Sequence, residues 1–139
     1  MAFSGPIADR LEIRELVETY NDAVNRRQTE DWKSTWADNA IWDLLGMEIE
    51  GREAIVKTWK SAIKNFSYMG FSSFPGAIEI NGETAHARIY VRETLISQNG
   101  QIRNIEGMYN DELVKQNGQW RFRKRAYQIL HETSSQKGQ

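Results

Sequence analysis

Three Asn-Gly pairs divide the second half of the chain into four segments of strand length. The pairs are Asn81-Gly82, Asn99-Gly100 and Asn117-Gly118, and they fall between Phe71 and His131. Asn and Gly readily adopt the positive φ angles that tight hairpin turns require, so each pair between alternating runs is a strong hairpin signal. The repeated signal predicts an antiparallel meander of four strands.

The first half of the chain supplies helices that can cover one face of this sheet. Apolar residues recur at helical spacing from Ile7 to Val24 and from Ile55 to Phe66, and Thr29 can cap a short helix between them. Residues 40–45 and 47–50 are typical of a short hairpin that turns at Gly46. The predicted fold is therefore α+β, with the meander and this N-terminal hairpin packed on three helices.

Length and charge narrow the function classes. The 139 residues suit one domain, which we expect to span residues 1–132, with a disordered tail at 133–139 that has no apolar residue. The 18 basic and 19 acidic residues give a net charge of −1, so we expect neither nucleic acid nor a membrane surface as a partner. No secretory signal and no apolar run of membrane-spanning length is present, which predicts a cytoplasmic protein.

Besides Tyr20 in the first helix, three segments stand out: Trp36-Ala37-Asp38-Asn39-Ala40-Ile41-Trp42, Glu50-Gly51-Arg52-Glu53-Ala54-Ile55 and Asn117-Gly118-Gln119-Trp120-Arg121-Phe122. In these residues the chain resembles the SnoaL-like branch of the nuclear-transport-factor-2-like superfamily. The resemblance implies a cone-shaped curved sheet around an apolar cavity, in homodimers or homotrimers. Members include scytalone dehydratase, ketosteroid isomerase, polyketide cyclases and hexachlorocyclohexane dehydrochlorinase.

One position departs from the pattern of the dehydrochlorinase and scytalone dehydratase group, to which residues 24–28 and Trp42 are most similar. That group pairs an aspartate at position 25 with a histidine near the start of the next long strand. This chain has Asn25, and residues 68–73, around the expected histidine, contain none. An amide cannot take up a proton at neutral pH, so we do not expect chemistry by that dyad. No metal-ligand or cofactor motif is present either, and we expect none to be needed.

Glu93 is the first candidate for a catalytic group. It alternates with Ala87, Ile89 and Val91, which places it on the apolar face of a strand. An unpaired carboxylate there would have a raised pKa and could exchange protons near neutral pH. The alternatives are an ion pair with Arg103 or Arg125, or a bulge that turns the side chain outward.

Three further side chains could take part in acid–base chemistry. Asp111 alternates with Gly107 and Tyr109 and is a second possible base. Tyr20, within the apolar stripe of the first helix, and Asn25 could donate hydrogen bonds to a carbonyl or an enolate. A tyrosine at such a position can equally be part of the core.

Aromatic residues could line a pocket for a ring-shaped ligand, although aromatic side chains also serve as core. The candidates are Trp42, Trp59, Phe71 and Tyr109. His131 alternates with Ile129 and Tyr127, so it could close one end of the cone; the alternative is a polar residue at the rim.

The sequence thus predicts a protein that binds an apolar cyclic, polyketide-like or steroid-like molecule in the cone. If it is an enzyme, we expect a cofactor-independent lyase, of dehydratase type, or an isomerase. One alternative is a binding module that has lost the dyad. Another is an assembly domain whose sheet face, with Tyr90, Arg92 and Thr94, packs against a second copy.

Overall fold

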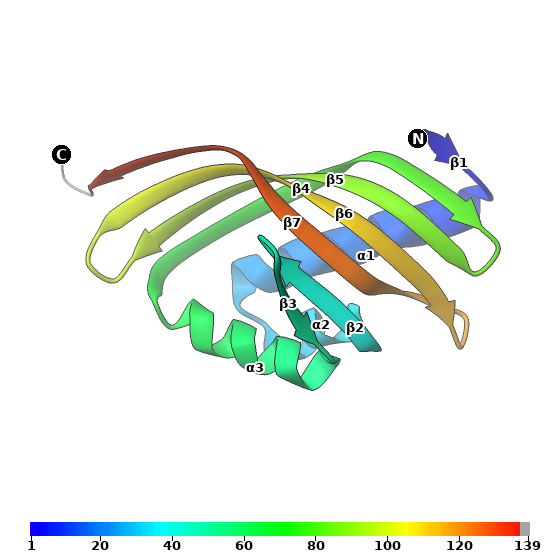
Figure 1. The fold of residues 1–139 in the computed structure, drawn as a ribbon, viewed down its shortest axis with the longest axis horizontal. Helices are drawn as coiled ribbons and strands as arrows, with labels where there is room; N and C mark the ends of the chain where they lie inside the picture. The colour runs from blue at the N-terminus through cyan, green and yellow to red at the C-terminus, as the bar shows by residue number, and fades with distance from the viewer. Residues whose placement is uncertain (137–139) are drawn as a thin grey trace.

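The computed structural model describes residues 1–136, which form three helices and one seven-stranded sheet that bends over them (Figure 1). The sheet order is β1-β4-β5-β6-β7-β2-β3. The elements in chain order are β1 (Phe3–Ser4), α1 (Ile7–Arg26), α2 (Thr29–Ser34), β2 (Trp36–Leu44), β3 (Met47–Glu50), α3 (Arg52–Ile63), β4 (Phe66–Asn81), β5 (Thr84–Ser97), β6 (Gln101–Gln116) and β7 (Gln119–Gln136). The predicted α+β cone fold is confirmed.

The meander consists of β4 to β7, and each strand pairs antiparallel with the next. At the last turn both Asn117 and Gly118 have positive φ, 52° and 76°, as a two-residue type I′ turn requires. At the other two Asn-Gly pairs only the glycine has positive φ. The signal therefore located all three hairpins, although only one has the turn type that it most strongly predicts.

The strands of the meander are longer than their sequences suggest. Phe66, the last residue of the helical pattern, instead begins β4, and residues 133–136, expected as a disordered tail, continue β7. Ser134 pairs with Arg103 and Gln136 with Gln101 of β6. Backbone pairing satisfies these residues without any apolar side chain. The rest of the predicted tail, residues 137–139, lies outside the described residues.

Two parallel pairings join the rest of the sheet to the meander. β1 pairs with β4, and β2 pairs with the free edge of β7. Strand β2 begins before the predicted segment 40–45, and its register against β7 shifts between Trp36 and Ile41. This irregularity bends the strand.

Helix α1 lies beneath the concave face of the sheet (Figure 1). Its predicted apolar stripe is buried: Ile13, Leu16, Val17, Tyr20 and Val24. Asn21 of the same helix is also buried, and the Ser73 hydroxyl donates to its Oδ1 over 2.6 Å. Side-chain hydrogen bonds of this kind fix the helix against β4 in one position, which packing alone does less specifically.

Aromatic side chains fill one part of the cone. Trp32 and Trp59 stack with ring centroids 4.4 Å apart, and Trp32 also packs edge-on against Trp36 and Trp42. Such contacts add to the burial of large rings. These tryptophans therefore form part of the hydrophobic core.

Within residues 1–136, no helix combines the length and the apolar character needed to cross a lipid bilayer.

Candidate functional site

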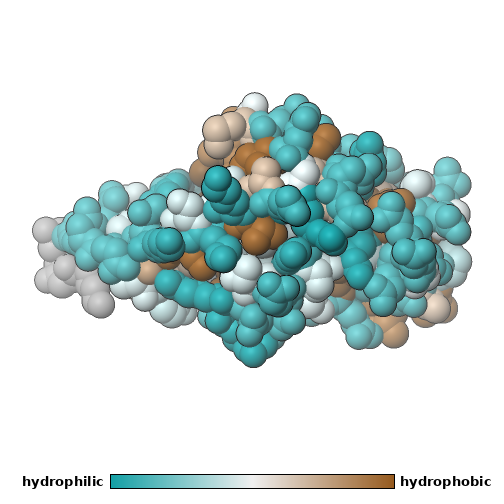
Figure 2. Space-filling model, turned by 90° about the horizontal axis from the view of Figure 1, so that it is seen from below, coloured by the Kyte–Doolittle hydropathy of each residue, from teal (hydrophilic) through white to brown (hydrophobic). Residues whose placement is uncertain are grey.

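A cavity of about 290 Å³ lies between the concave face of the sheet and helices α1 and α3. Its walls are mostly apolar, and polar groups reach it at few points, which is typical of small-molecule sites. The surface on the underside of the molecule is largely hydrophilic, with hydrophobic residues in separate patches (Figure 2). Of the predicted site residues, six line this cavity: Tyr20, Trp42, Trp59, Phe71, Glu93 and Tyr109.

Glu93 extends from β5 into the cavity and accepts a hydrogen bond of 2.5 Å from the hydroxyl of Tyr127. Burial raises the pKa of the Glu93 carboxyl, and the hydrogen bond from Tyr127 and the charge of Arg103 offset part of this rise. Burial likewise raises the pKa of Tyr127, so that phenol stays protonated and donates. Neither arginine that could have paired with Glu93 does so: Arg103 binds Glu132 at 2.7 and 3.1 Å, and Arg125 binds Asp111.

Gly107 makes the contact between Tyr127 and Glu93 possible. Tyr127 stands on β7 and Glu93 on β5, and β6 runs between them. A Cβ atom at position 107 would lie only 2.4 Å from the Tyr127 hydroxyl oxygen. Since no side chain could fit there without moving that phenol, the glycine provides the gap across which the two residues meet.

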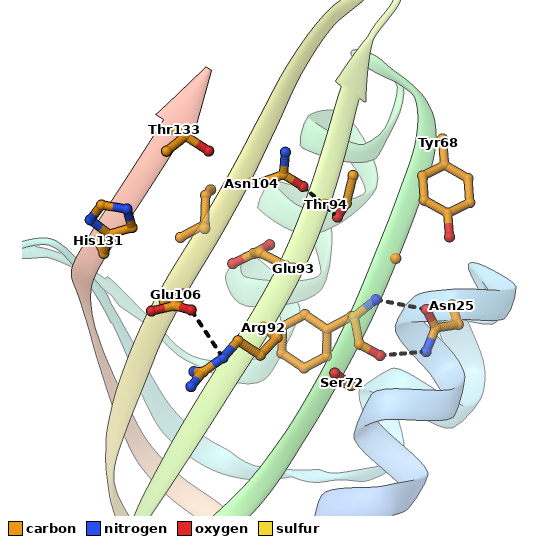
Figure 3. A pocket seen from close by; sticks show the side chains of 13 residues that line it. Asn25, Tyr68, Ser72, Arg92, Glu93, Thr94, Asn104, Glu106, His131 and Thr133 are labelled. Carbon is orange, nitrogen blue, oxygen red and sulfur yellow. Dashed lines mark hydrogen bonds and ion pairs between the residues drawn. The ribbon is translucent and has the colours of Figure 1, made fainter. Parts of the chain in front are cut away.

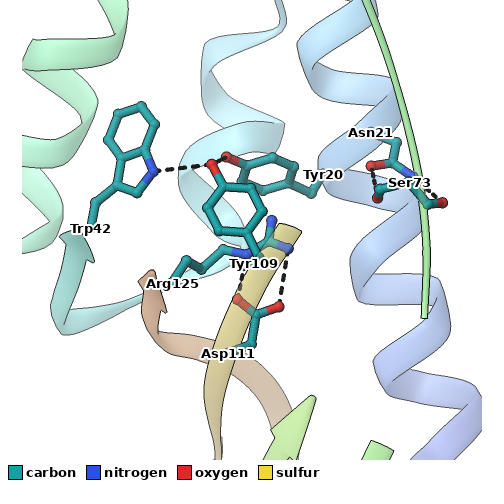
Figure 4. Close-up of polar contacts among 7 residues, drawn as sticks. All are labelled: Tyr20, Asn21, Trp42, Ser73, Tyr109, Asp111 and Arg125. Carbon is teal, nitrogen blue, oxygen red and sulfur yellow. Dashed lines mark hydrogen bonds and ion pairs between the residues drawn. The ribbon is translucent and has the colours of Figure 1, made fainter. Parts of the chain in front are cut away.

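A second polar cluster consists of Tyr20, Tyr109 and Trp42 (Figure 4). The Trp42 indole donates to the Tyr109 hydroxyl over 3.2 Å, and the two phenol oxygens are 3.4 Å apart. Burial raises the pKa of both phenols, so both keep their protons. One of these two protons can serve the contact between the phenols, and the other has no acceptor within residues 1–136. The pair therefore has a hydrogen-bond donor to spare.

Asp111 and Arg125 form an ion pair beside these phenols (Figure 4). Both side chains are fully buried, and the guanidinium donates to both carboxylate oxygens at 2.8 and 3.0 Å. The Arg125 Cζ atom also lies 3.8 Å from the centre of the Tyr109 ring and 4.4 Å from that of Tyr20. Asp111 faces inward as predicted, but a carboxylate held in this way does not serve as a base.

Asn25 does not line the 290 Å³ cavity; it lies at a second, more open groove, where it connects α1 to β4 (Figure 3). Its Nδ2 donates to the Phe71 carbonyl over 2.6 Å and to the Asn21 carbonyl over 2.9 Å, while its Oδ1 accepts from the Phe71 N–H over 2.8 Å. Because the amide is occupied by the backbone, it does not fit the predicted role of donor to a ligand. It acts as a link between two elements of the fold.

Introducing an acid at this position should weaken the fold. We expect Asn25→Asp to lower the free energy of unfolding at neutral pH by about 1–3 kcal/mol, because a carboxylate cannot donate to the two carbonyl groups. Urea denaturation measures the change. The loss should shrink at acidic pH, where the protonated acid regains a donor. An unchanged midpoint at neutral pH would contradict the assigned link, and Asn25→Ala separates lost bonds from added charge.

His131, predicted to close one end of the cavity, lies on the opposite face of the sheet. Ile129 pairs with Gly107 and His131 with the adjacent Glu106, which leaves Leu130 as an extra residue in β7. Such a bulge reverses the alternation of side chains. The exposed His131 instead lines a polar groove of about 480 Å³ that also contains Glu106 and Arg92, whose side chains form an ion pair of 3.4 Å (Figure 3).

Comparison with known proteins identifies relatives of this chain. Residues 6–126 match the family of SnoaL-like domains. Uncharacterised proteins of Mycobacterium tuberculosis and Mycobacterium bovis are 26% identical to it over 123 residues, which cover 86% of this chain and 84% of theirs.

Solved structures share the fold at lower sequence identity. A candidate scytalone dehydratase from Novosphingobium aromaticivorans superposes with a TM-score of 0.84 at 18% identity, covering 91% of this chain and 87% of the other. Hexachlorocyclohexane dehydrochlorinase LinA-type3 from Novosphingobium barchaimii gives 0.82 at 21% identity, over 93% and 91%. At these identities the likeness concerns the fold alone. Because the family match spans most of its residues, this chain belongs to the family of SnoaL-like domains.

Proposed function

We propose that this protein binds a neutral ring compound with a carbonyl group and moves a proton on the carbon next to it, as a cofactor-independent isomerase or lyase. The observation that carries the proposal is one cavity that holds both a half-buried carboxylate, Glu93, and a phenol pair with a spare donor, Tyr20 and Tyr109. The Tyr109 and Tyr127 rings are 4.8 Å apart at their centres, so the phenol pair lies next to the partner of Glu93.

The two polar clusters divide the reaction between them. The Glu93 carboxylate takes the proton from carbon, and the electron pair of the broken C–H bond moves into the carbonyl, which becomes an enolate. The spare phenol proton stabilises the charge that develops on the enolate oxygen. Where the ring has a double bond between the β and γ carbons, the enolate is conjugated with it, and Glu93 returns the proton to the γ carbon, which moves the double bond next to the carbonyl. Alternatively it gives the proton to a departing hydroxyl on the next carbon, which eliminates water.

The cavity also narrows the class of compound. About 290 Å³ is at the lower end of the volumes of ligand sites, which favours one or two rings over a steroid. The fold likeness to proteins named for dehydration and dehydrochlorination supports an elimination, although the residues here differ from an Asp/His dyad.

A bicyclic ketone, 2-tetralone, tests the proposal. At 100 times its dissociation constant a ligand stabilises the fold by about 2.7 kcal/mol, which a thermal-shift measurement detects. In D₂O, NMR follows the replacement of its α-hydrogens by deuterium, which we expect the protein to accelerate. Binding without exchange would favour the non-catalytic binding module. The absence of both binding and exchange would contradict the proposal.

We also propose that the outer face of the sheet joins copies of this chain into a homodimer or homotrimer. Phe74 is 50% exposed and packs against Tyr90, and Arg92 lies 5.9 Å from the centre of the Phe74 ring. Exposed aromatic and arginine side chains are enriched at interfaces. Light scattering should give a mass of two or three chains, and Phe74→Glu should reduce it to one. A monomeric mass of the unmodified protein would contradict this proposal.

A further inference from the structure

The turn between β2 and β3 holds a leucine in a backbone conformation that leucine rarely adopts. Leu45 has a φ of 55° and Gly46 a φ of 94°, and the Asp43 carboxylate accepts the Gly46 N–H over 2.8 Å. Glycine, asparagine and aspartate suit this left-handed region, whereas a bulky apolar residue is strained there. The Leu45 side chain is 62% exposed, so burial within this chain does not compensate the strain.

The other residues of this kind have an explanation within the fold. Among residues 1–136, only Arg27 and Asn117 share a positive φ without being glycine. Asn117 belongs to the type I′ turn described above. Arg27 ends α1 and donates to the carbonyl groups of Ile63 and Phe66, at 3.3 and 2.8 Å. Leu45 and Gly46 also form a two-residue hairpin turn, between the paired residues Leu44 and Met47, so the hairpin explains the backbone conformation. It does not explain the leucine, because asparagine or glycine would form the same turn without strain. A strained and exposed leucine at such a position points to a role outside the folded chain itself.

Leu45 stands at the rim of the cavity, next to the proposed acid–base pair. Leu44 of β2 pairs with Tyr127 of β7, the residue that donates to Glu93. The turn begins at the next residue, so it lies beside Tyr127. Strand β2 ends there while β7 continues, and the turn lies under the arch of the sheet (Figure 1). Leu45 itself lines the cavity.

We infer that Leu45 is a specificity-determining residue: its side chain closes over the apolar ring of a bound ligand, which buries it. The inference rests on the proposed function, because it requires a ring compound in the cavity. Single exposed apolar residues are common on protein surfaces. Met47, two residues further along, is such a case, since it is 61% exposed and does not line the cavity. Leu45 differs from Met47 because it stands at the rim of the cavity and has a strained backbone.

Two matched substitutions test the inference, with 2-naphthol as the probe and the quenching of tryptophan fluorescence as the signal of binding. Leu45→Asn should weaken binding about five- to tenfold, the factor expected when roughly half of a leucine side chain is no longer buried. Leu45→Gly should do the same. Met47→Asn removes similar exposed surface from the same hairpin and should leave the affinity unchanged.

Thermal unfolding of the free variants supplies the second measurement. Asparagine and glycine relieve the strain, so Leu45→Asn and Leu45→Gly should melt at or above the temperature of the unmodified protein. Lower melting temperatures would assign the leucine to the fold and overturn the inference. Equal affinity for 2-naphthol, or no binding by the unmodified protein, would overturn it too. Failure of the proposed reaction is distinct, because it is judged by deuterium exchange into 2-tetralone and not by affinity.

Discussion

Replacing Glu93 by glutamine is expected to slow the exchange of α-hydrogens in 2-tetralone by about 10²- to 10⁴-fold. The amide keeps the shape of the side chain and can still accept the hydrogen bond from Tyr127, but it cannot take up a proton. NMR in D₂O measures both rates. Glu106→Gln is the matched control, because Glu106 is an exposed carboxylate on the outer face, paired with Arg92, and its loss should leave the rate unchanged.

Glu93→Gln should also stabilise the fold at neutral pH. The pKa of Glu93 is raised in the folded state, so the folded protein binds more protons than the unfolded chain. The free energy of unfolding therefore falls as the pH rises from the ordinary pKa of glutamate through the raised one. Glu93→Gln removes this loss, and urea denaturation above that window should show a higher midpoint. The rate of the unmodified protein should rise through the same window, because the carboxylate is the base.

An unchanged rate in Glu93→Gln would exclude this carboxylate as the base. A variant with lost activity and lost stability would indicate a structural carboxylate instead. Only a slower reaction in a protein at least as stable fits the proposed role, since groups held for catalysis commonly cost stability.

Asp111→Leu should produce the largest loss of stability, about 3–5 kcal/mol, because it leaves the buried guanidinium of Arg125 without its partner. Urea denaturation measures the loss. Replacing both members, Asp111→Leu with Arg125→Met, should recover most of it, because no charge is then left buried. Glu112→Gln breaks the exposed pair with Arg123 and serves as the control, with an expected change below about 1 kcal/mol.

The double variant separates packing from charge. A loss that persists in the double variant would mean that the shape of the Asp111–Arg125 pair, and not its charge balance, supports the rings of Tyr20 and Tyr109 above it. A loss below about 1 kcal/mol in Asp111→Leu would contradict the burial of the pair altogether.

Alternation along strands predicted which face a residue occupies, and it succeeded where the strand is regular. Glu93, Tyr109 and Asp111 all face inward as expected. It failed at His131, because the bulge at Leu130 adds one residue to β7 and reverses the faces beyond it. No local pattern in the sequence marks that bulge.

The alternation of residues along a strand also does not predict which side chains on other strands they contact. Tyr127 escaped the sequence analysis as a site residue because its contact with Glu93 crosses three strands and depends on their register. A glycine in the middle of a predicted strand, Gly107, was the available signal, since such a residue often marks a close approach. The ion pair of Asp111 likewise could not be predicted, because it depends on the sheet register that places Arg125 opposite it.

The link between Asn25 and β4 has an evolutionary consequence. A change to aspartate at position 25 removes the donor to the Phe71 carbonyl before a histidine on β4 can use the new acid. A histidine introduced first meets an amide that cannot act with it as a base. Neither single step gives a working dyad, so a route from this asparagine to an Asp/His dyad passes through an intermediate that lacks the activity of the dyad. With asparagine at position 25, the fold itself resists a change to aspartate.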